Sequence, residues 1–313
     1  MNSPFTIIFM GTPDFAVPAL QALIQNGYNV PLVVTQPDRP KGRSRKPVAP
    51  PLKTKALELD LKVLQPATLR DEKFREWIKK LQPDFFVVVA FGHIISEDIL
   101  QLPRLGTINI HASLLPKYRG PAPIQWAIVK GESETGITTM LMDKGIDTGD
   151  ILLSQKEPIF PEDTAASLHD RLSVCGADLL IKTLQAYASE AIKPIPQDHH
   201  NATYAPMLKK QDGHIRWQKS ADELDAFIRG MTPWPGAFTF HHKNRLKILK
   251  AAPVSESTEK SPGTILKTFP DELWVATAKG ALSIIEIQGP SGKRLAIADF
   301  LRGYQLPAGT LLR

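Results

Sequence analysis

The chain has 313 residues, of which 42% are hydrophobic and 22% are charged. This composition excludes a fibrous or largely disordered protein, and the length predicts two domains. The sequence has no run of about 18 to 20 apolar residues, and its start, Met1 to Phe9, lacks a signal-peptide pattern. We therefore expect a cytoplasmic protein with no membrane partner. The single cysteine, Cys175, lies on an apolar helical stripe, which predicts core packing.

The net charge of +6 is unevenly distributed along the chain. Over residues 1–205 the 22 Lys and Arg balance the 22 Asp and Glu, whereas residues 206–313 hold 16 basic and 10 acidic residues. All the excess positive charge therefore lies in the last third. This placement fits a surface for a polyanion, but the charge alone is equally compatible with a basic protein that binds no nucleic acid.

The first two hundred residues alternate short β-rich runs with stretches that favour helices, the pattern of a parallel sheet covered by helices. One run, Phe85-Phe86-Val87-Val88-Val89, is apolar throughout, as a central strand buried on both faces would be. The predicted strands are Thr6 to Met10, Val30 to Thr35, Phe85 to Ala90, Thr107 to Ile110, Thr138 to Met142 and Ile151 to Lys156. The predicted helices are Ala19 to Asn26, Asp71 to Leu81 and Ala165 to Ala186.

A polar, proline-broken segment at 194–201 predicts a connector between domains. Beyond it, Ser220 and Glu223 have the spacing of a capping box at the start of one short helix. The remainder reads as short strands separated by turns, which favours a small β-barrel of the OB type. We expect a catalytic domain at 1–200, a linker at 201–212 and an OB-like domain at 213–313. The expected strands are Ala237 to Phe240, Arg245 to Leu249, Gly263 to Lys267, Leu273 to Thr277 and Ala281 to Ile287.

The turn after the first strand, Gly11-Thr12-Pro13-Asp14-Phe15, occupies the usual position of a dinucleotide fingerprint. It lacks the three glycines that let a backbone approach a pyrophosphate, and Pro13 and Asp14 supply neither space nor positive charge. A nicotinamide-dependent enzyme is therefore not expected.

Two polar groups, Asn109 and His111, lie two residues apart at the end of a predicted strand, so both side chains leave the same face. The carboxyl edge of an open α/β sheet is where such folds place their sites. A glycine-rich acidic loop, 142–150, offers a third polar group. Each feature taken alone is more often structural, since strand-end polar residues and Asp-Gly turns are common.

The joint pattern is more specific. N-x-H-x-S-L-L-P runs from Asn109 to Pro116, and D-x-G-x-D-T-G-D follows from Asp143 to Asp150. This pair resembles the signature of enzymes that use 10-formyltetrahydrofolate. Together with the segments at 11–16, 35–40 and 233–236, the chain resembles the methionyl-tRNA formyltransferase family from end to end, without departure in the motif. The resemblance implies a doubly wound, mostly parallel, Rossmann-like formyltransferase domain that transfers a formyl group to methionyl-initiator tRNA.

The resemblance implies Asn109, His111 and Asp147 as the catalytic group. Asn109 and a His111 N–H would stabilise negative charge on the formyl oxygen, and Asp147 would orient the imidazole and assist proton transfer. We expect the folate to bind at the neighbouring loops, with His93 as lining at best. The expected folate contacts are Phe91, Gly92, Ile94, Ser113, Leu114, Leu115, Pro116, Met142 and Asp143.

A basic, proline-bounded loop at 37–47 leaves the same sheet edge and resembles the family's acceptor-binding loop. Its cations and those of the basic second domain are expected to hold the tRNA backbone. The expected tRNA contacts are Arg39, Lys41, Arg43, Arg45, Lys46, Lys209, Lys210, Arg245 and Lys247. We predict no metal, because the pairs His199-His200 and His241-His242 lack ligand spacing and are expected at the surface. We expect a monomer.

Three rival functions are weighed against this one. An amino-sugar nucleotide N-formyltransferase and a hydrolase of 10-formyltetrahydrofolate would use similar catalytic residues, but neither needs the basic loop or the basic last third. A tRNA-binding module without catalysis does not account for the intact set of Asn109, His111 and Asp147.

Overall fold

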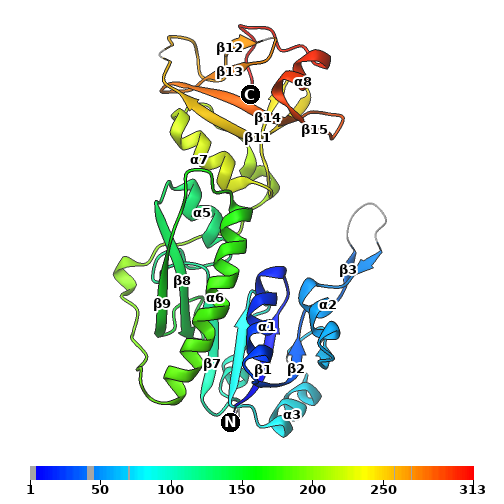
Figure 1. Ribbon diagram of the computed structural model, residues 1–313, viewed down its shortest axis with the longest axis vertical. Coiled ribbons are helices and arrows are strands. Elements are labelled where there is room, and N and C mark those ends of the chain that lie inside the picture. The colour runs from blue at the N-terminus through cyan, green and yellow to red at the C-terminus, as the bar shows by residue number, and fades with distance from the viewer. Residues whose placement is uncertain (1–4, 41–45, 70, 257, 269) are drawn as a thin grey trace. The chain divides into compact units, whose positions relative to one another are not determined.

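The computed structural model describes residues 5–40, 46–69, 71–256, 258–268 and 270–313 (Figure 1). The chain forms two compact units. The first unit comprises residues 1–123, 134–158 and 169–205, and the second comprises 124–133, 159–168 and 206–313. No helix among the described residues is both long and apolar enough to cross a membrane.

A seven-stranded sheet forms the centre of the first unit. Five neighbouring strands pair in parallel and the last two pairings are antiparallel, which confirms the predicted doubly wound, mostly parallel sheet. In sheet order the strands are β5 (Val63–Leu64), β2 (Asn29–Val34), β1 (Thr6–Gly11), β6 (Phe85–Val89), β7 (Gly106–His111), β8 (Glu134–Leu141) and β9 (Ile151–Pro158). The chain runs outward from β1 in both directions, so the strand order reverses between β1 and β6. Open α/β sheets bind ligands beyond the carboxyl ends of the strands at such a reversal.

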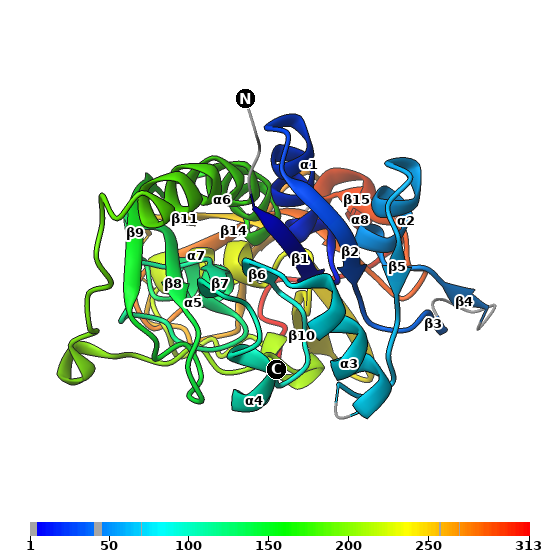
Figure 2. The same cartoon turned by 90° about the horizontal axis from the view of Figure 1, so that it is seen from below.

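Helices cover both faces of this sheet, as Figure 2 shows from below. On one face α3 (Glu72–Leu81) and α4 (Glu97–Leu100) pack on apolar side chains of β1, β2 and β6. On the other face lie α1 (Val17–Gln25) and α6 (Ala165–Ala188). A Cβ at Gly176 of α6 would come within 2.9 Å of Ile110 Cγ2, so this glycine lets the helix approach the sheet closely. The continuous apolar character of β6 follows from burial on both faces.

Several short elements were not predicted. They include the helix α2 (Pro51–Glu58), which starts with proline at its first position, a position that tolerates proline because its N–H needs no partner. No element was predicted from the sequence in that region. The other unpredicted elements are α4, α5 (Pro123–Val129), α8 (Ile297–Gly303), the 3-10 helices η1 (Asp14–Ala16), η2 (His199–Asn201) and η3 (Lys210–Gly213), the strands β5 and β15 (Arg294–Ala296), and the two-stranded hairpin of β3 (Arg39–Pro40) and β4 (Pro47–Val48).

An antiparallel curled sheet forms most of the second unit. Its strands are β10 (Ala237–His241), β11 (Asn244–Val254), β14 (Ala281–Gln288), β13 (Leu273–Ala276) and β12 (Ile265–Thr268), and β15 (Arg294–Ala296) pairs with β14. The helix α7 (Ala221–Met231) packs on β11 and β14. Its predicted capping box is confirmed: the Ser220 hydroxyl accepts from Glu223 N at 3.3 Å, and Ser220 N donates to Glu223 Oε2 at 3.0 Å.

The C-terminal segment joins the two edges of this sheet. At the β12 edge, Ile265 N donates to Thr310 O at 2.8 Å. At the β10 edge, Arg313 N donates to Phe240 O at 3.0 Å, and Phe240 N donates to Arg313 O at 2.6 Å. Residues 310–313 therefore act as an additional short strand that closes the sheet on itself. This closure gives the OB-like barrel that the sequence predicted.

Candidate active site

The strand β7 carries two of the three predicted catalytic residues, Asn109 and His111, and the third, Asp147, lies next to His111. His111 is the last residue of β7 and is 6% exposed. Its Nδ1 lies 3.6 Å from Oδ2 of Asp147, which belongs to the loop between β8 and β9. Its Nε2 lies 3.0 Å from the Tyr118 carbonyl oxygen. Because that carbonyl can only accept, Nε2 carries a proton in this arrangement, and Nδ1 faces the carboxylate.

Asp147 is held from a second direction. Its Oδ2 accepts a hydrogen bond of 2.7 Å from the backbone N–H of Gly120. Its backbone has a φ of +53°, in the left-handed region that side-chain-bearing residues seldom adopt. A residue in such a conformation persists only when its surroundings impose it, and such residues gather at functional sites.

Asn109 lies in β7 two residues before His111. Its Oδ1 is buried without a hydrogen-bond partner among the described residues, and the same is true of Thr35 Oγ1 and His93 Nε2. Asn109 lies two residues before the end of β7, Thr35 directly follows β2, and His93 follows β6, so all three are near the carboxyl edge of the sheet. Buried polar atoms are nearly always paired, so three unpaired atoms along one edge mark a place prepared for a polar ligand. Thr35 was not predicted as a site residue from the sequence, although it begins the segment 35–40 that resembles the family.

The turn that follows β7 is rigidly held. Ser113 Oγ donates to Lys117 O at 2.6 Å, Thr138 Oγ1 donates to Ser113 O at 2.7 Å, and Leu115 N donates to Thr138 Oγ1 at 3.1 Å. Ser113 and Leu115 are buried, Leu114 and Pro116 are half-buried, and the Leu115–Pro116 peptide is cis. These four predicted folate contacts therefore belong to a turn held in place directly after the strand that carries His111.

The other predicted folate residues are spread over different environments. Phe91 is 2% exposed within the core on the α3 face, and Met142 packs against that core. Ile94 is 95% exposed, and Asp143 is exposed with its Oδ1 accepting from Gly145 N at 2.9 Å. Gly92 is exposed with a φ of +78°. A small hollow of about 180 Å³ lies beside this loop, lined by Ala67, Thr68, Leu69, His93, Ile94 and Ser96.

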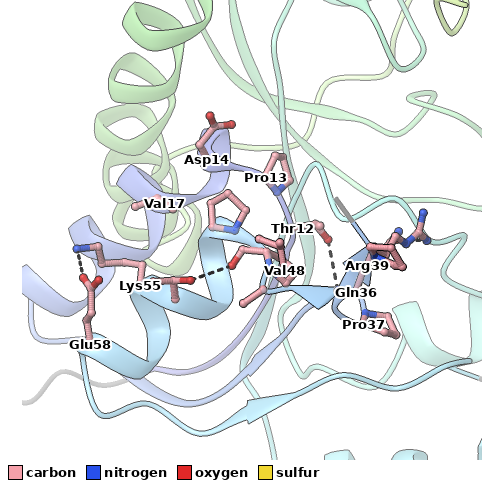
Figure 3. A pocket seen from close by; sticks show the side chains of 15 residues that line it. Thr12, Pro13, Asp14, Val17, Gln36, Pro37, Arg39, Val48, Lys55 and Glu58 are labelled. Carbon is pink, nitrogen blue, oxygen red and sulfur yellow. Dashed lines mark hydrogen bonds and ion pairs between the residues drawn. The ribbon is translucent and has the colours of Figure 1, made fainter. Parts of the chain in front are cut away.

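A larger hollow of about 780 Å³ lies beyond the carboxyl ends of β1 and β2 (Figure 3). It begins at Thr12, whose Oγ1 donates to Phe91 O at 2.9 Å, and at Gln36, whose Nε2 donates to the same oxygen at 3.2 Å. These bonds tie the ends of β1, β2 and β6 together at the reversal of strand order. Prolines make up a third of the lining: Pro13, Pro37, Pro40, Pro50 and Pro51.

Described residues of the basic loop line part of this hollow. Arg39 is exposed and lines it, and Lys46 is exposed next to β4. Lys41, Arg43 and Arg45 lie outside the described residues. The base of the loop is fixed by Lys53, whose Nζ lies 2.8 Å from Asp38 Oδ1. Hydrogen bonds from Lys53 and Gln65 lower the pKa of the Asp38 carboxyl.

The predicted tRNA contacts of the second unit fall into two groups. Lys209 and Lys210 are exposed at η3. Arg245 and Lys247 of β11 are half-buried, and the Arg245 guanidinium lies 3.6 Å from the ring centre of Phe238. Arg245 Nε is buried without a hydrogen-bond partner among the described residues.

No group of three His, Cys, Asp or Glu side chains that could hold a metal ion occurs among the described residues. His199 and His200 are exposed, but the expectation for His241 was wrong, because it is 9% exposed and its Nδ1 lies 3.0 Å from the Tyr304 hydroxyl. Its place in β10, against the ring of Tyr304, accounts for this burial. Cys175 is buried as predicted, and burial raises the pKa of its thiol.

Comparisons with known proteins agree with the two parts of the fold. A family model described as formyl transferase matches residues 5–184, and one described as formyl transferase, C-terminal domain, matches residues 207–305. Among solved structures, a methionyl-tRNA formyltransferase from Clostridium thermocellum has a TM-score of 0.56 at 18% identity, over 80% of this chain and 93% of that one. An N-formyltransferase from Helicobacter canadensis, in complex with folinic acid and dTDP-3-aminofucose, has a TM-score of 0.67 at 22% identity, over 90% and 98%.

Those two likenesses establish the fold, and sequence identity distinguishes between their families. A methionyl-tRNA formyltransferase from Syntrophus aciditrophicus (strain SB) is 47% identical over 307 residues, which cover 98% of each chain. At this identity over nearly the whole length, with both formyl transferase domains matched and the strand-end motif assembled, the chain belongs to the methionyl-tRNA formyltransferase family.

Proposed function

We propose that the protein transfers the formyl group of 10-formyltetrahydrofolate to the amino group of methionine on initiator tRNA, with Asn109, His111 and Asp147 as its catalytic residues. One observation supports this assignment above the others. An imidazole with a carboxylate 3.6 Å away lies two residues from Asn109, whose buried amide oxygen has no partner among the described residues, at the sheet edge where open α/β folds bind ligands.

In this proposal the donor supplies the formyl carbon, and the chain's own groups manage charge and protons. The Asn109 Nδ2 amide would donate a hydrogen bond to the formyl oxygen as negative charge develops there. The His111 N–H, also expected to reach that oxygen, is bonded to the Tyr118 carbonyl here. Nδ1 of His111, facing Asp147, is therefore the nitrogen placed to exchange protons.

The proton balance requires one acceptor and one donor. As the amine nitrogen bonds to the formyl carbon it loses a proton, and the folate nitrogen gains one as its bond to that carbon breaks. The pair of His111 and Asp147 takes up the first proton and returns one to the second site. No metal enters this scheme.

The donor side is proposed at the loops after β6 and β8. A pterin presents hydrogen-bond donors and acceptors along one edge, and the unpaired Nε2 of His93 fits such a ligand. The expected contacts Phe91, Gly92 and Ile94 follow β6, those at 113–116 follow β7, and Met142 and Asp143 follow β8. The small hollow beside His93 and Ile94 adjoins this side.

The acceptor side is proposed at the larger hollow. It lies at the ends of β1 and β2, and β1 is two strand spacings from β7, a distance of about 10 Å. An aminoacyl group and its terminal nucleoside span a length of this order. The proline-rich wall suits a flat base or a thioether side chain, and the basic residues of the segment 39–46 are proposed to bind the phosphates.

The remaining expectations follow from this role. We place the reaction in the cytoplasm, where translation begins, and propose a monomer with residues 1–200 as catalytic domain, 201–212 as linker and 213–313 as tRNA-binding domain. The exposed Lys209 and Lys210 and the half-buried Arg245 and Lys247 would contact the tRNA backbone.

The experiment is formyl transfer from 10-formyltetrahydrofolate to charged initiator tRNA, beside uncharged tRNA and an amino-sugar nucleotide. We expect transfer to the charged tRNA only. Formylation of the sugar, or hydrolysis of the donor alone, would overturn the proposed acceptor and leave the catalytic group in place.

Two histidine substitutions distinguish a defect in the formyl-transfer step from a defect in tRNA binding. His111→Ala should reduce kcat at least about 100-fold, within the range for loss of an acid–base group, while the Kd for tRNA stays within threefold. The control is His200→Ala, because His200 is exposed and its side chain takes no part in the proposed site. If His111→Ala weakened tRNA binding as much as it slowed turnover, the catalytic role would be wrong.

A further inference from the structure

Two buried residues outside the proposed catalytic group connect to it. Arg119 is 2% exposed and Gln197 is 5% exposed. Gln197 lies in the segment before η2, and Arg119 lies in the turn after β7. A buried guanidinium loses the hydration of its charge, which is costly unless its N–H groups are bonded. The burial of the Arg119 guanidinium beside the site therefore needs a structural explanation.

The Gln197 side chain uses all of its polar groups. Its Nε2 donates to Asp147 O at 2.9 Å and to Gly149 O at 2.7 Å. Its Oε1 accepts from Arg119 Nε at 3.1 Å and from Arg119 Nη2 at 2.7 Å. Since arginine only donates and a backbone carbonyl only accepts, this amide can be satisfied in one orientation alone. Arg119 thus determines which end of Gln197 faces the Asp147 loop.

The backbone around Arg119 contacts both members of the proposed proton-transfer pair. On one side of it, the Tyr118 carbonyl bonds to His111 Nε2 at 3.0 Å. On the other side, Gly120 N bonds to Asp147 Oδ2 at 2.7 Å. The side chain of Arg119 then reaches the Asp147 backbone through Gln197. These contacts form a closed ring. It passes from His111 through residues 118–120 and Gln197 to Asp147, and the 3.6 Å contact between Asp147 and His111 closes it.

Further residues of the segment 199–205 hold Arg119 in place. Arg119 N donates to Thr203 O at 2.8 Å, and Ala205 N donates to Arg119 O at 2.7 Å. Nη2 of Arg119 also lies 3.0 Å from Nδ1 of His199. The sequence predicted a connector that begins at residue 194. Residues 197–205 instead belong to the first unit and are hydrogen-bonded to the site.

We propose that Arg119 and Gln197 are positioning residues for formyl transfer: Arg119 orients the Gln197 amide, and Gln197 holds the left-handed backbone of Asp147 so that its carboxylate stays against His111. This inference rests on the proposed catalytic roles of His111 and Asp147. Neither Arg119 nor Gln197 touches the substrate in this scheme.

The test is the substitution Gln197→Glu. A glutamate keeps oxygen acceptors for Arg119 but cannot donate to the Asp147 and Gly149 carbonyls, so it removes the hold on the loop and retains the buried partner of the guanidinium. We expect kcat to fall about 10- to 100-fold, as a misplacement on the order of 1 Å does, with KM for both substrates within threefold. The melting temperature should stay within a few degrees. Gln25→Glu, at the exposed end of α1, makes the same charge change as a control.

A double-mutant cycle with Asp147→Asn, measured by single-turnover kinetics, distinguishes positioning from a general structural effect. If Gln197 acts through Asp147, Gln197→Glu should change the rate less than twofold once Asp147 is asparagine. The same dependence should hold for Arg119→Lys, which serves if Gln197→Glu fails to fold. Rate losses that multiply independently in the double variant would overturn the inference. A near-normal rate for Asp147→Asn alone would instead overturn the proposed function.

Discussion

The substitution Asn109→Ala should separate activity from stability. In most proteins, removing a buried polar side chain breaks a hydrogen bond and costs about 1 kcal/mol or more. Asn109 Oδ1 is buried and has no partner among the described residues, so the fold already carries the cost of its lost hydration, of the order of 1–3 kcal/mol. Alanine removes that cost and also removes some packing. The two effects oppose each other, and the free energy of unfolding should change by less than about 1 kcal/mol.

The effect on catalysis should be large. If the Asn109 amide stabilises charge on the formyl oxygen, its loss should lower kcat about 10²- to 10³-fold, which corresponds to about 2.7–4 kcal/mol. The assay is formyl transfer to charged initiator tRNA under saturating substrates, together with thermal unfolding of the same preparation. The melting temperature should move by no more than about 4 °C.

Thr139→Val is the matched control. Thr139 is fully buried on the neighbouring β8, but its hydroxyl is paired with Thr183 Oγ1 at 2.8 Å. Its substitution should therefore lower stability by about 1 kcal/mol and leave kcat near that of the unmodified protein. The reasoning is refuted if Asn109→Ala loses stability as Thr139→Val does while retaining its turnover.

Two further predictions concern pH and backbone strain. Burial, with a smaller contribution from the charge of His242, lowers the pKa of His241 from 6.5, so the unfolded chain binds the proton more readily. The associated stability is present above pH 6.5 and is lost as the pH falls through the folded-state pKa. The melting temperature of His241→Gln should therefore decline less between pH 7.5 and 5 than that of the unmodified protein. An unchanged decline would contradict this. Gly120→Ala forces a Cβ to within 2.7 Å of the Ala205 carbonyl oxygen at a φ of +114°, so it should lower the melting temperature. It should also lower kcat, because Gly120 N holds the Asp147 carboxylate. Gly27→Ala, at a φ of +74° with open space around it, should cost only about 1–2 kcal/mol and no activity, and equal kcat losses in the two variants would contradict the role of Gly120.

The sequence by itself determined the sheet and the members of the strand-end cluster. The continuous apolar run of β6 and the strand-end positions of Asn109 and His111 depend on local periodicity, which is visible in one dimension. The long motif identified Asp147 as their companion. The capping box at Ser220 and Glu223 was likewise readable, because its hydrogen bonds join residues three apart.

Only the tertiary structure decided how that cluster is held. Gln197 and Asp147 are 50 residues apart, and Arg119 and Gln197 are 78 apart, so no local pattern connects them. The unpaired oxygen of Thr35 and the burial of His241 are also invisible in the sequence, because each depends on side chains brought from distant strands. Sequence patterns report which groups leave one edge of an element, whereas long-range packing decides which of them meet, which are paired and which are left for a ligand.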